Sequence, residues 1–197
     1  MRTIAIVQAR TSSSRLPGKV MLPLAGEPMI VYQLQRLKRC ECLDHFVLAT
    51  SDDPSDDALA ESVAAEGFSV FRGALEDVLE RFRSCSAHFQ ASTVVRLTGD
   101  CPLSDPVLID ELVGAFFGGG WDYLANCADE HQLSVPDGFD AEVFRAEVLQ
   151  RAFAEARLPS EREHVTPWMR SKAAGLRWGH FKHQPVRPYY RATVDDP

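Results

Sequence analysis

Three cations lie within ten residues near the start of the chain: Arg10, Arg15 and Lys19. The uncharged, mostly β-branched run 3–7 before them is typical of a strand buried on both faces of a parallel sheet. Ligands of open α/β sheets bind beyond the carboxyl ends of the strands, where these three side chains would project. An arginine fork pairs with two phosphate oxygens at once, and backbone N–H groups of a tight turn supply further donors. The segment therefore predicts a loop that binds a polyphosphate.

Two other interpretations of this segment fit less well. A charge cluster is usually a solvated face, but a solvated face does not explain Pro17-Gly18 or the serine run 12–14. A Walker phosphate loop needs a glycine five residues before Gly18 and a Ser or Thr after the lysine, whereas this chain has Ser13 and Val20 there. We therefore favour a phosphate-binding loop of another type.

Two acidic residues are candidates for a metal site. Asp100 directly follows the predicted buried strand 93–97 and Thr98-Gly99, and a glycine at this point lets a ligand or another backbone segment approach closely. A lone Asp in a loop is more often a cap, but Asp195 ends another strand-like segment, 189–194. Mg²⁺ is usually held by one or two carboxylates plus phosphates and water. We expect Asp100 and Asp195 to bind Mg²⁺ for a polyphosphate transfer.

The elements that must position these residues alternate between strand and helix through the first 125 residues. The patterns predict strands at 3–7, 46–50, 68–71, 93–97 and 121–125, and helices at 28–37, 53–66, 76–89 and from Asp105-Pro106 to the glycines 118–120. They then predict a loop over the site at 130–139, helices at 145–156 and 161–172, the second opened by a Ser160/Glu163 capping box, and strands at 176–181 and 189–194. The fold class predicted is α/β with a mostly parallel, doubly wound sheet.

In this register, four motifs follow four successive strands: Gln8-Ala9-Arg10, Thr50-Ser51-Asp52, Arg72-Gly73 and Thr98-Gly99-Asp100. One crevice at the carboxyl edge of the sheet could therefore collect all four. Turn and cap chemistry alone explains the second motif well, because strand-to-helix loops are rich in Gly, Ser and Asp. It explains the arginines and the Gly-Asp pair poorly.

Composition excludes several classes of protein. The 197 residues, 45% of them hydrophobic, suffice for one core and one domain. The five cysteines are an odd number without a Cys-x-x-Cys pair, which argues against a disulfide framework or a zinc site and favours a cytoplasmic protein. A net charge of −7 argues against a nucleic-acid partner, and no apolar run approaches the ~18 residues of a membrane span.

The chain resembles the cytidylyltransferase family of CMP-sugar synthetases, most closely its spore-coat polysaccharide biosynthesis branch. The matching segments, in chain order, are 8–20, 49–52, 70–73, 77–82, 96–102, 136–144, 162–167 and 193–195. This resemblance implies a nucleotide-diphospho-sugar transferase (GT-A-like) fold, CTP as donor and a sugar or sugar acid as acceptor. It also allows a homodimer. Because members usually continue well past the motif at 193–195, we expect the carboxyl end to be shortened.

The resemblance implies roles for individual residues. Residues 1–125 would bind the nucleotide, with the base and ribose framed by Gln8, Ala9, Arg72 and Gly73, and the triphosphate held by Arg10, Arg15 and Lys19. Residues 126–197 would bind the acceptor through Asp137, Asp140, Glu142 and His164. For these four, simpler interpretations stay open: a turn at Asp137-Gly138, a strand-surface charge at Glu142 and a structural histidine in a capped helix.

The expected reaction is an in-line attack of an acceptor hydroxyl on the α-phosphorus of CTP, with pyrophosphate leaving. Arg15, Lys19 and Asp100 would carry the catalysis by placing charge. Cys101 has no identifiable base partner and is expected to be a packed residue, not a nucleophile. Two alternatives remain, a glycosyltransferase that uses a nucleotide sugar and a non-catalytic nucleotide-binding homologue.

Overall fold

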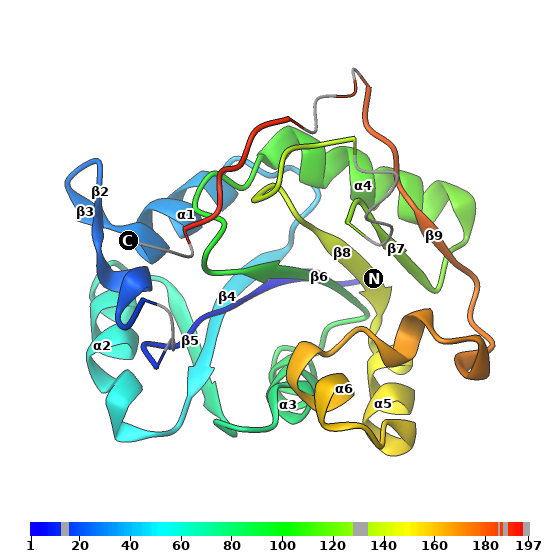
Figure 1. Cartoon of the computed structure of the whole chain (residues 1–197), viewed down its shortest axis with the longest axis horizontal. Helices are drawn as coiled ribbons and strands as arrows, with labels where there is room; N and C mark the ends of the chain where they lie inside the picture. The colour runs from blue at the N-terminus through cyan, green and yellow to red at the C-terminus, as the bar shows by residue number, and fades with distance from the viewer. Residues whose placement is uncertain (13–15, 128–133, 185, 187–188, 195–197) are drawn as a thin grey trace.

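A seven-stranded sheet runs through the molecule in the order β5-β4-β1-β6-β8-β7-β9. The computed structural model describes residues 1–12, 16–127, 134–184, 186 and 189–194 (Figure 1). The strands of this sheet are β1 (Thr3–Gln8), β4 (His45–Ser51), β5 (Ser69–Gly73), β6 (Thr93–Thr98), β7 (Tyr123–Ala125), β8 (Glu142–Arg145) and β9 (Trp178–His180). The pairs of β1 with β4 and β6, of β4 with β5, and of β7 with β9 are parallel. The mostly parallel sheet expected from the sequence is confirmed.

Helices cover both faces of the sheet (Figure 1). They are α1 (Met29–Leu37), α2 (Asp57–Ala65), α3 (Val78–His88), α4 (Pro106–Gly119), α5 (Ala146–Glu155) and α6 (Pro159–His164). Alternate residues of β1 enter opposite cores, as the period of two in a strand requires. Ala5 and Val7 join the core under α1, α2 and α4, whereas Ile4 and Ile6 join the core under α3 and α5.

Short elements complete the chain. A small hairpin joins β2 (Pro23–Leu24) to β3 (Glu27–Pro28), and single turns of 3₁₀ helix form η1 (Lys19–Met21), η2 (Pro54–Asp56), η4 (Trp168–Arg170) and η5 (Lys172–Ala174). Within the described residues, no helix has both the length and the apolar character needed to cross a lipid bilayer.

The cap signals of the first half are confirmed. The Asp105 side chain accepts from the backbone N–H groups of Val107 and Leu108 at 2.9 and 3.4 Å, and Pro106 opens α4. That helix ends at Gly120, which takes the left-handed conformation with φ +63°. Asp53 likewise accepts from Ser55 N at 2.9 Å before α2. These local interactions place the loops that follow β4 and β6.

Three predictions for the second half are wrong. The helix predicted over 161–172 is broken: α6 ends at His164, Val165 takes φ +69°, and Pro167 cannot donate a helical hydrogen bond. The predicted Ser160/Glu163 capping box does not form, because Glu161 instead accepts from Arg157 N and Leu158 N at 2.8 and 2.9 Å.

The strand predicted over 189–194 is reduced to a single bridge between Asp137 and Arg191. This segment lies on the loop that carries Asp137 instead of on the sheet edge, since Ala192 N donates to Asp137 O at 2.7 Å and Val194 N donates to Asp100 O at 2.9 Å. Part of the loop predicted over 130–139 lies outside the described residues.

One strand of the seven-stranded sheet is not among the predicted elements. The segment Glu142–Arg145 forms β8, which lies antiparallel between β6 and β7. The predicted acceptor half therefore contributes strands to the same sheet as the predicted nucleotide half.

Candidate active site

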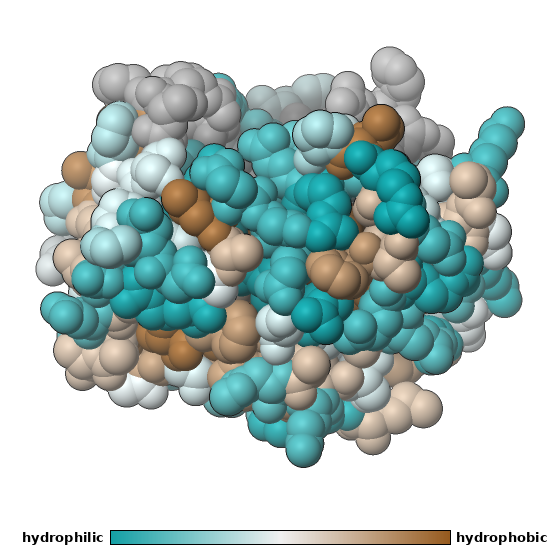
Figure 2. Space-filling view, turned by 90° about the horizontal axis from the view of Figure 1, so that it is seen from below, coloured by the Kyte–Doolittle hydropathy of each residue, from teal (hydrophilic) through white to brown (hydrophobic). Residues whose placement is uncertain are grey.

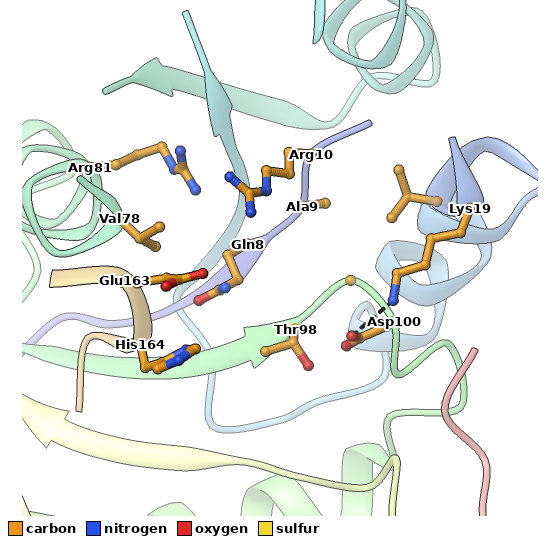
Figure 3. Close-up of a pocket in the computed structure, with 12 residues that line it drawn as sticks. Gln8, Ala9, Arg10, Lys19, Val78, Arg81, Thr98, Asp100, Glu163 and His164 are labelled. Carbon is orange, nitrogen blue, oxygen red and sulfur yellow. Dashed lines mark hydrogen bonds and ion pairs between the residues drawn. The ribbon is translucent and has the colours of Figure 1, made fainter. Parts of the chain in front are cut away.

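A cleft of about 290 Å³ opens at the carboxyl ends of β1 and β6 (Figure 3). Its walls also come from α3 and α6, so segments far apart in the sequence meet here. The lining residues are Gln8, Ala9, Arg10, Lys19, Val20, Val78, Arg81, Thr98, Gly99, Asp100, Glu163 and His164. The crevice predicted beyond the strand ends thus gathers two of its four motifs, those after β1 and β6.

At one end of the cleft lie Lys19 and Asp100, two residues predicted to act in catalysis. The Lys19 Nζ is 3.2 Å from Asp100 Oδ2, and both side chains are largely buried. Gly18 positions the lysine: it takes φ +71° and donates its N–H to Thr11 O at 2.8 Å, which folds the loop back over the sheet edge. The neighbouring thiol of Cys101 has its pKa raised by burial and by Asp100, which fits a packed residue.

Gly99 allows the two central strands to converge below this pair. A methyl group at Gly99 would lie 2.7 Å from the Ala9 Cβ and 3.1 Å from Gln8 O. Gly99 N donates to Gln8 O at 2.8 Å, so the two strand ends are joined at the floor of the cleft. The close approach predicted at this glycine is therefore observed, and it involves Ala9 and the backbone of Gln8.

At the other end of the cleft, Arg10 and Arg81 direct their guanidinium groups toward one another (Figure 3). Arg81 lies in the first turns of α3 and is 2% exposed. Its Nη1 donates to Ala74 O at 2.7 Å. Burial and the nearby Arg10 lower the pKa of Arg81. Arg81 is not among the predicted site residues, although it lies in the segment 77–82 that carries the family resemblance.

A buried charge network supports the floor. Arg96 on β6 lies directly opposite Glu142 on β8, and the two form an ion pair. The Arg96 Nε also donates to Gln8 Oε1 at 3.0 Å, while Glu142 Oε1 accepts from Tyr123 Oη at 2.6 Å and Thr166 Oγ1 at 2.7 Å. Burial alone would raise the pKa of Glu142, but Arg96 and these hydroxyl donors hold it below its usual value. Glu142 is predicted to bind the acceptor sugar, but both of its carboxylate oxygens are engaged in contacts within the protein.

A second cavity of about 300 Å³ adjoins the cleft and shares Thr98 and His164 with it. Its other lining residues are Arg96, Cys127, Asp140, Glu142, Thr166 and Arg170. Burial and the charges of Asp137, Glu142 and Asp100 raise the pKa of Asp140 to about 6. Three of the four predicted acceptor residues, Asp140, Glu142 and His164, thus line one cavity.

Asn126, which sequence analysis missed, holds the Asp140 loop in place. The side chain of this fully buried residue donates to Phe139 O at 2.8 Å and accepts from Ala141 N at 2.9 Å. It therefore fixes the backbone on both sides of Asp140. No sequence motif indicated this contact, because the partners are 13 and 15 residues away across a loop.

An ion pair brings α6 to the cleft. Arg162 Nε donates to Asp77 Oδ2 at 3.0 Å, and Asp77 is also the cap that accepts from Glu80 N at 2.9 Å. The next two residues, Glu163 and His164, thereby face the space between α3 and β6 (Figure 3).

Three of the predicted site residues line neither cavity. Arg72 donates to Ser51 O and pairs with Asp57 at 2.6 Å, on the side of α2. Gly73 lies behind Arg81, since a methyl group there would be 3.3 Å from Arg81 Cγ. Asp137 is half exposed and pairs with Arg191 at 3.2 Å. Arg15 and Asp195 lie outside the described residues. The roles assigned to these five stay predictions.

Among the described residues, no group of three or more His, Cys, Asp or Glu side chains is arranged to hold a metal ion. Asp100 nevertheless suits Mg²⁺, since its carboxylate is 30% exposed at a strand end and Asp140 is near enough for their charges to interact. Mg²⁺ commonly takes only one or two protein carboxylates and completes its shell with phosphate and water. The donor set fits a cation that arrives with a polyphosphate.

Comparison with known proteins agrees with this arrangement. The family model described as Cytidylyltransferase matches residues 4–194. The chain is 37% identical over 198 residues to the spore coat polysaccharide biosynthesis protein SpsF of Bacillus subtilis, covering 96% of this chain and 80% of that protein. It is 34% identical over 122 residues to a 3-deoxy-manno-octulosonate cytidylyltransferase of an Anaeromyxobacter species, covering 60% of this chain and 49% of the relative.

A solved structure of a cytidylyltransferase from Leptospira borgpetersenii superposes with a TM-score of 0.92 at 32% identity, covering 99% of this chain and 82% of that one. In open α/β sheets ligands bind beyond the carboxyl ends of the strands, and the basic cleft of this chain lies there. The chain belongs to the cytidylyltransferase family.

Proposed function

We propose that this protein transfers CMP from CTP to a sugar or sugar acid and releases pyrophosphate, in the synthesis of a polysaccharide precursor. The observation that carries the proposal is the junction of two cavities at Thr98 and His164. The first is basic at both ends and suits a nucleoside triphosphate, and the second holds carboxylate and cationic groups that suit a polyhydroxy acid. The two substrates would thus meet above β6.

In the proposed reaction, an acceptor hydroxyl oxygen forms a bond to the α-phosphorus while the bond from that phosphorus to the bridging oxygen breaks. Pyrophosphate leaves with the electron pair of that bond, and the hydroxyl proton passes to solvent. Lys19 and Arg10, together with the predicted Arg15, would neutralise the charge that builds on the leaving group. The protein acts chiefly by position and charge, and no covalent intermediate is required.

The acceptor would occupy the cavity lined by Asp140, His164 and Arg170. The name of the Anaeromyxobacter relative gives a sugar acid as its substrate, and that of the Bacillus relative places it in polysaccharide biosynthesis. Carboxylates accept hydrogen bonds from sugar hydroxyls, and arginine and histidine would face an acid group. His164 is the residue we expect to separate acceptor binding from CTP binding.

Mg²⁺ would be held by Asp100 and the predicted Asp195. When bound, it would offset negative charge on the phosphoryl oxygens. The contribution of this chain's own residues is to place the Asp100 carboxylate beside Lys19 at the end of β6.

The test of the proposal is Asp100→Asn, with pyrophosphate release measured for CTP and the three other common nucleoside triphosphates against several sugar acids. The amide keeps the shape and one acceptor for Lys19 but removes the charge. We expect turnover with CTP to fall ~10²–10³-fold. The melting temperature should change little, since the Asp100 carboxylate is 30% exposed and an ion pair with access to solvent is worth about 1 kcal/mol or less.

Asp105→Asn is the matched control, because Asn caps a helix as well as Asp does and turnover should stay normal. Near-normal pyrophosphate release by Asp100→Asn would contradict the proposed role. Failure of the unmodified protein to release pyrophosphate with every triphosphate, while CTP raises its melting temperature, would instead favour a non-catalytic nucleotide-binding protein.

A further inference from the structure

Arg81 is held in one orientation from behind. Its aliphatic stem packs on Gly73, where a methyl group would lie 3.3 Å from the Arg81 Cγ. Its Nη1 is anchored to Ala74 O at 2.7 Å, with Leu75 O at 3.5 Å. The guanidinium therefore reaches the cleft in a fixed position.

The remaining edge of this guanidinium is unsatisfied. The Arg81 Nε is buried without a hydrogen-bond partner. In the described part of the chain, this guanidinium donates only to the two carbonyl groups at its Nη1. Nε and Nη2 form the edge with which arginine makes two parallel hydrogen bonds to an oxyanion. A buried donor without a partner is costly, so this edge fits a ligand better than an empty space.

The opposite wall adds a second cation. Arg10 points at Arg81 across the cleft (Figure 3), and within the described residues neither arginine forms an ion pair with a carboxylate. Asp56 is close enough to act on Arg81, but its own oxygens accept from Thr11 and Ser51. Two facing guanidinium groups repel one another. An anion bound between them would attract both and offset that repulsion.

We propose that Arg81 and Arg10 form an oxyanion subsite that binds a phosphate group of the nucleotide, separate from the contact of Lys19 with Asp100. A neutral base would satisfy the hydrogen bonds of Arg81 but not the charge of the pair, whereas a phosphate satisfies both. This inference rests on the proposed function and adds a second anchor for the triphosphate. It also gives a reason for the glycine after Arg72, because a side chain at Gly73 would crowd both Phe71 and the stem of Arg81.

The experiment measures binding of CTP, pyrophosphate and cytidine by calorimetry in Arg81→Lys, Arg10→Gln and the double variant. Lysine keeps the charge of Arg81 but cannot form the two-bond edge. We expect each single variant to bind CTP about 10-fold more weakly or worse, with cytidine affinity unchanged. Because both residues would hold one group, the loss in the double variant should be smaller than the two losses combined.

Arg83→Lys is the matched control on the same helix, since Arg83 pairs with Glu80 and lies over Phe153, away from the cleft. Melting temperatures show whether each variant folds, and Arg10→Gln, on the less buried side, keeps the test valid if Arg81→Lys does not. CTP affinity equal to that of the unmodified protein would overturn the subsite, as would an equal loss for cytidine. Failure of the unmodified protein to bind CTP would overturn the proposed function instead.

Discussion

Asp140 is a carboxylate held at a position where folding alone would favour an uncharged side chain. Its carboxylate is placed among Asp137, Glu142 and Asp100, and Asn126 fixes the backbone on both sides of it. A charged group held in such surroundings costs stability. A carboxylate with a raised pKa that lines a cavity is typical of a binding site.

The first prediction concerns the pH dependence of stability. The pKa of Asp140 is raised from 3.8 in the unfolded chain to about 6. Below the unfolded value both states are protonated, and stability is then lost as the pH rises through the folded value. Asp140→Asn should therefore be more stable than the unmodified protein at pH 7.5, by about 1–3 kcal/mol, with no difference near pH 3.5. Urea denaturation across this pH range measures it.

Asp57→Asn serves as the comparison, because it removes a half-exposed carboxylate that pairs with Arg72 and is not among the charges that raise the pKa of Asp140, so it should bring no gain in stability at pH 7.5. A lower stability of Asp140→Asn at neutral pH would show that the carboxylate is needed by the fold and not by a ligand.

At the scale of elements, the site depends on how closely the carboxyl ends of β1 and β6 approach one another. Gly99 N donates to Gln8 O, and no room exists for a side chain between Gly99 and Ala9. The same strand end carries Asp100, whose carbonyl accepts from Val194 N of the carboxyl-terminal segment. Small shifts of the backbone at Gly99 would therefore displace Gln8 and Ala9, which are expected to contact the nucleotide, and Asp100, the predicted metal ligand.

The second prediction follows from this contact. Gly99→Ala must displace Ala9 or Gln8, since its methyl group would lie 2.7 Å from the Ala9 Cβ. We expect a loss of about 1–3 kcal/mol in unfolding free energy and a larger proportional loss of CTP affinity. Thermal unfolding and calorimetry measure the two effects.

Gly114→Ala is its control, because Gly114 lies inside α4 with nothing within 4 Å of the added methyl group. That substitution should raise stability by ~0.5–1 kcal/mol and leave CTP binding unchanged. Gly99→Ala with unchanged affinity for CTP would separate the strand junction from nucleotide binding.

At the scale of the whole molecule, an acidic protein carries a basic cleft. The net charge is −7, yet Arg10, Lys19 and Arg81 line the cleft. The face shown in Figure 2 is mostly hydrophilic, with hydrophobic residues in small separate groups. A cleft focuses its own field, so these local cations can attract an anion that the whole molecule repels.

The third prediction concerns the salt dependence of CTP binding, which separates the electrostatic field of the cleft from that of the net charge. Raising KCl from about 0.05 to 0.5 M should weaken CTP binding several-fold, because the Debye length shortens to about 4 Å and the cleft's attraction is screened. Cytidine binding, which involves no phosphate charge, should change little. Calorimetry at constant Mg²⁺ measures both. CTP affinity that rises with salt would show that the net negative charge, and not the cleft, dominates the field at the site.

The sequence by itself determined the alternation of strands and helices in the first half, the cap at Asp105 and the predicted loop from Arg10 to Lys19. It also carried the family resemblance. These features depend on residues a few positions apart, where periodicity, turn chemistry and capping act directly.

Tertiary structure alone decided the rest. Arg81 meets Arg10, Arg96 meets Gln8 and Glu142, and α6 reaches the cleft only because Arg162 pairs with Asp77. In the hydrogen bonds of Arg96 with Gln8 and Glu142 and of Arg162 with Asp77, the partners are 46 to 88 residues apart. The antiparallel entry of β8 into the sheet creates one of these contacts, that between Arg96 and Glu142. Strand order and helix packing decide which charged groups pair. A local sequence pattern specifies neither of them.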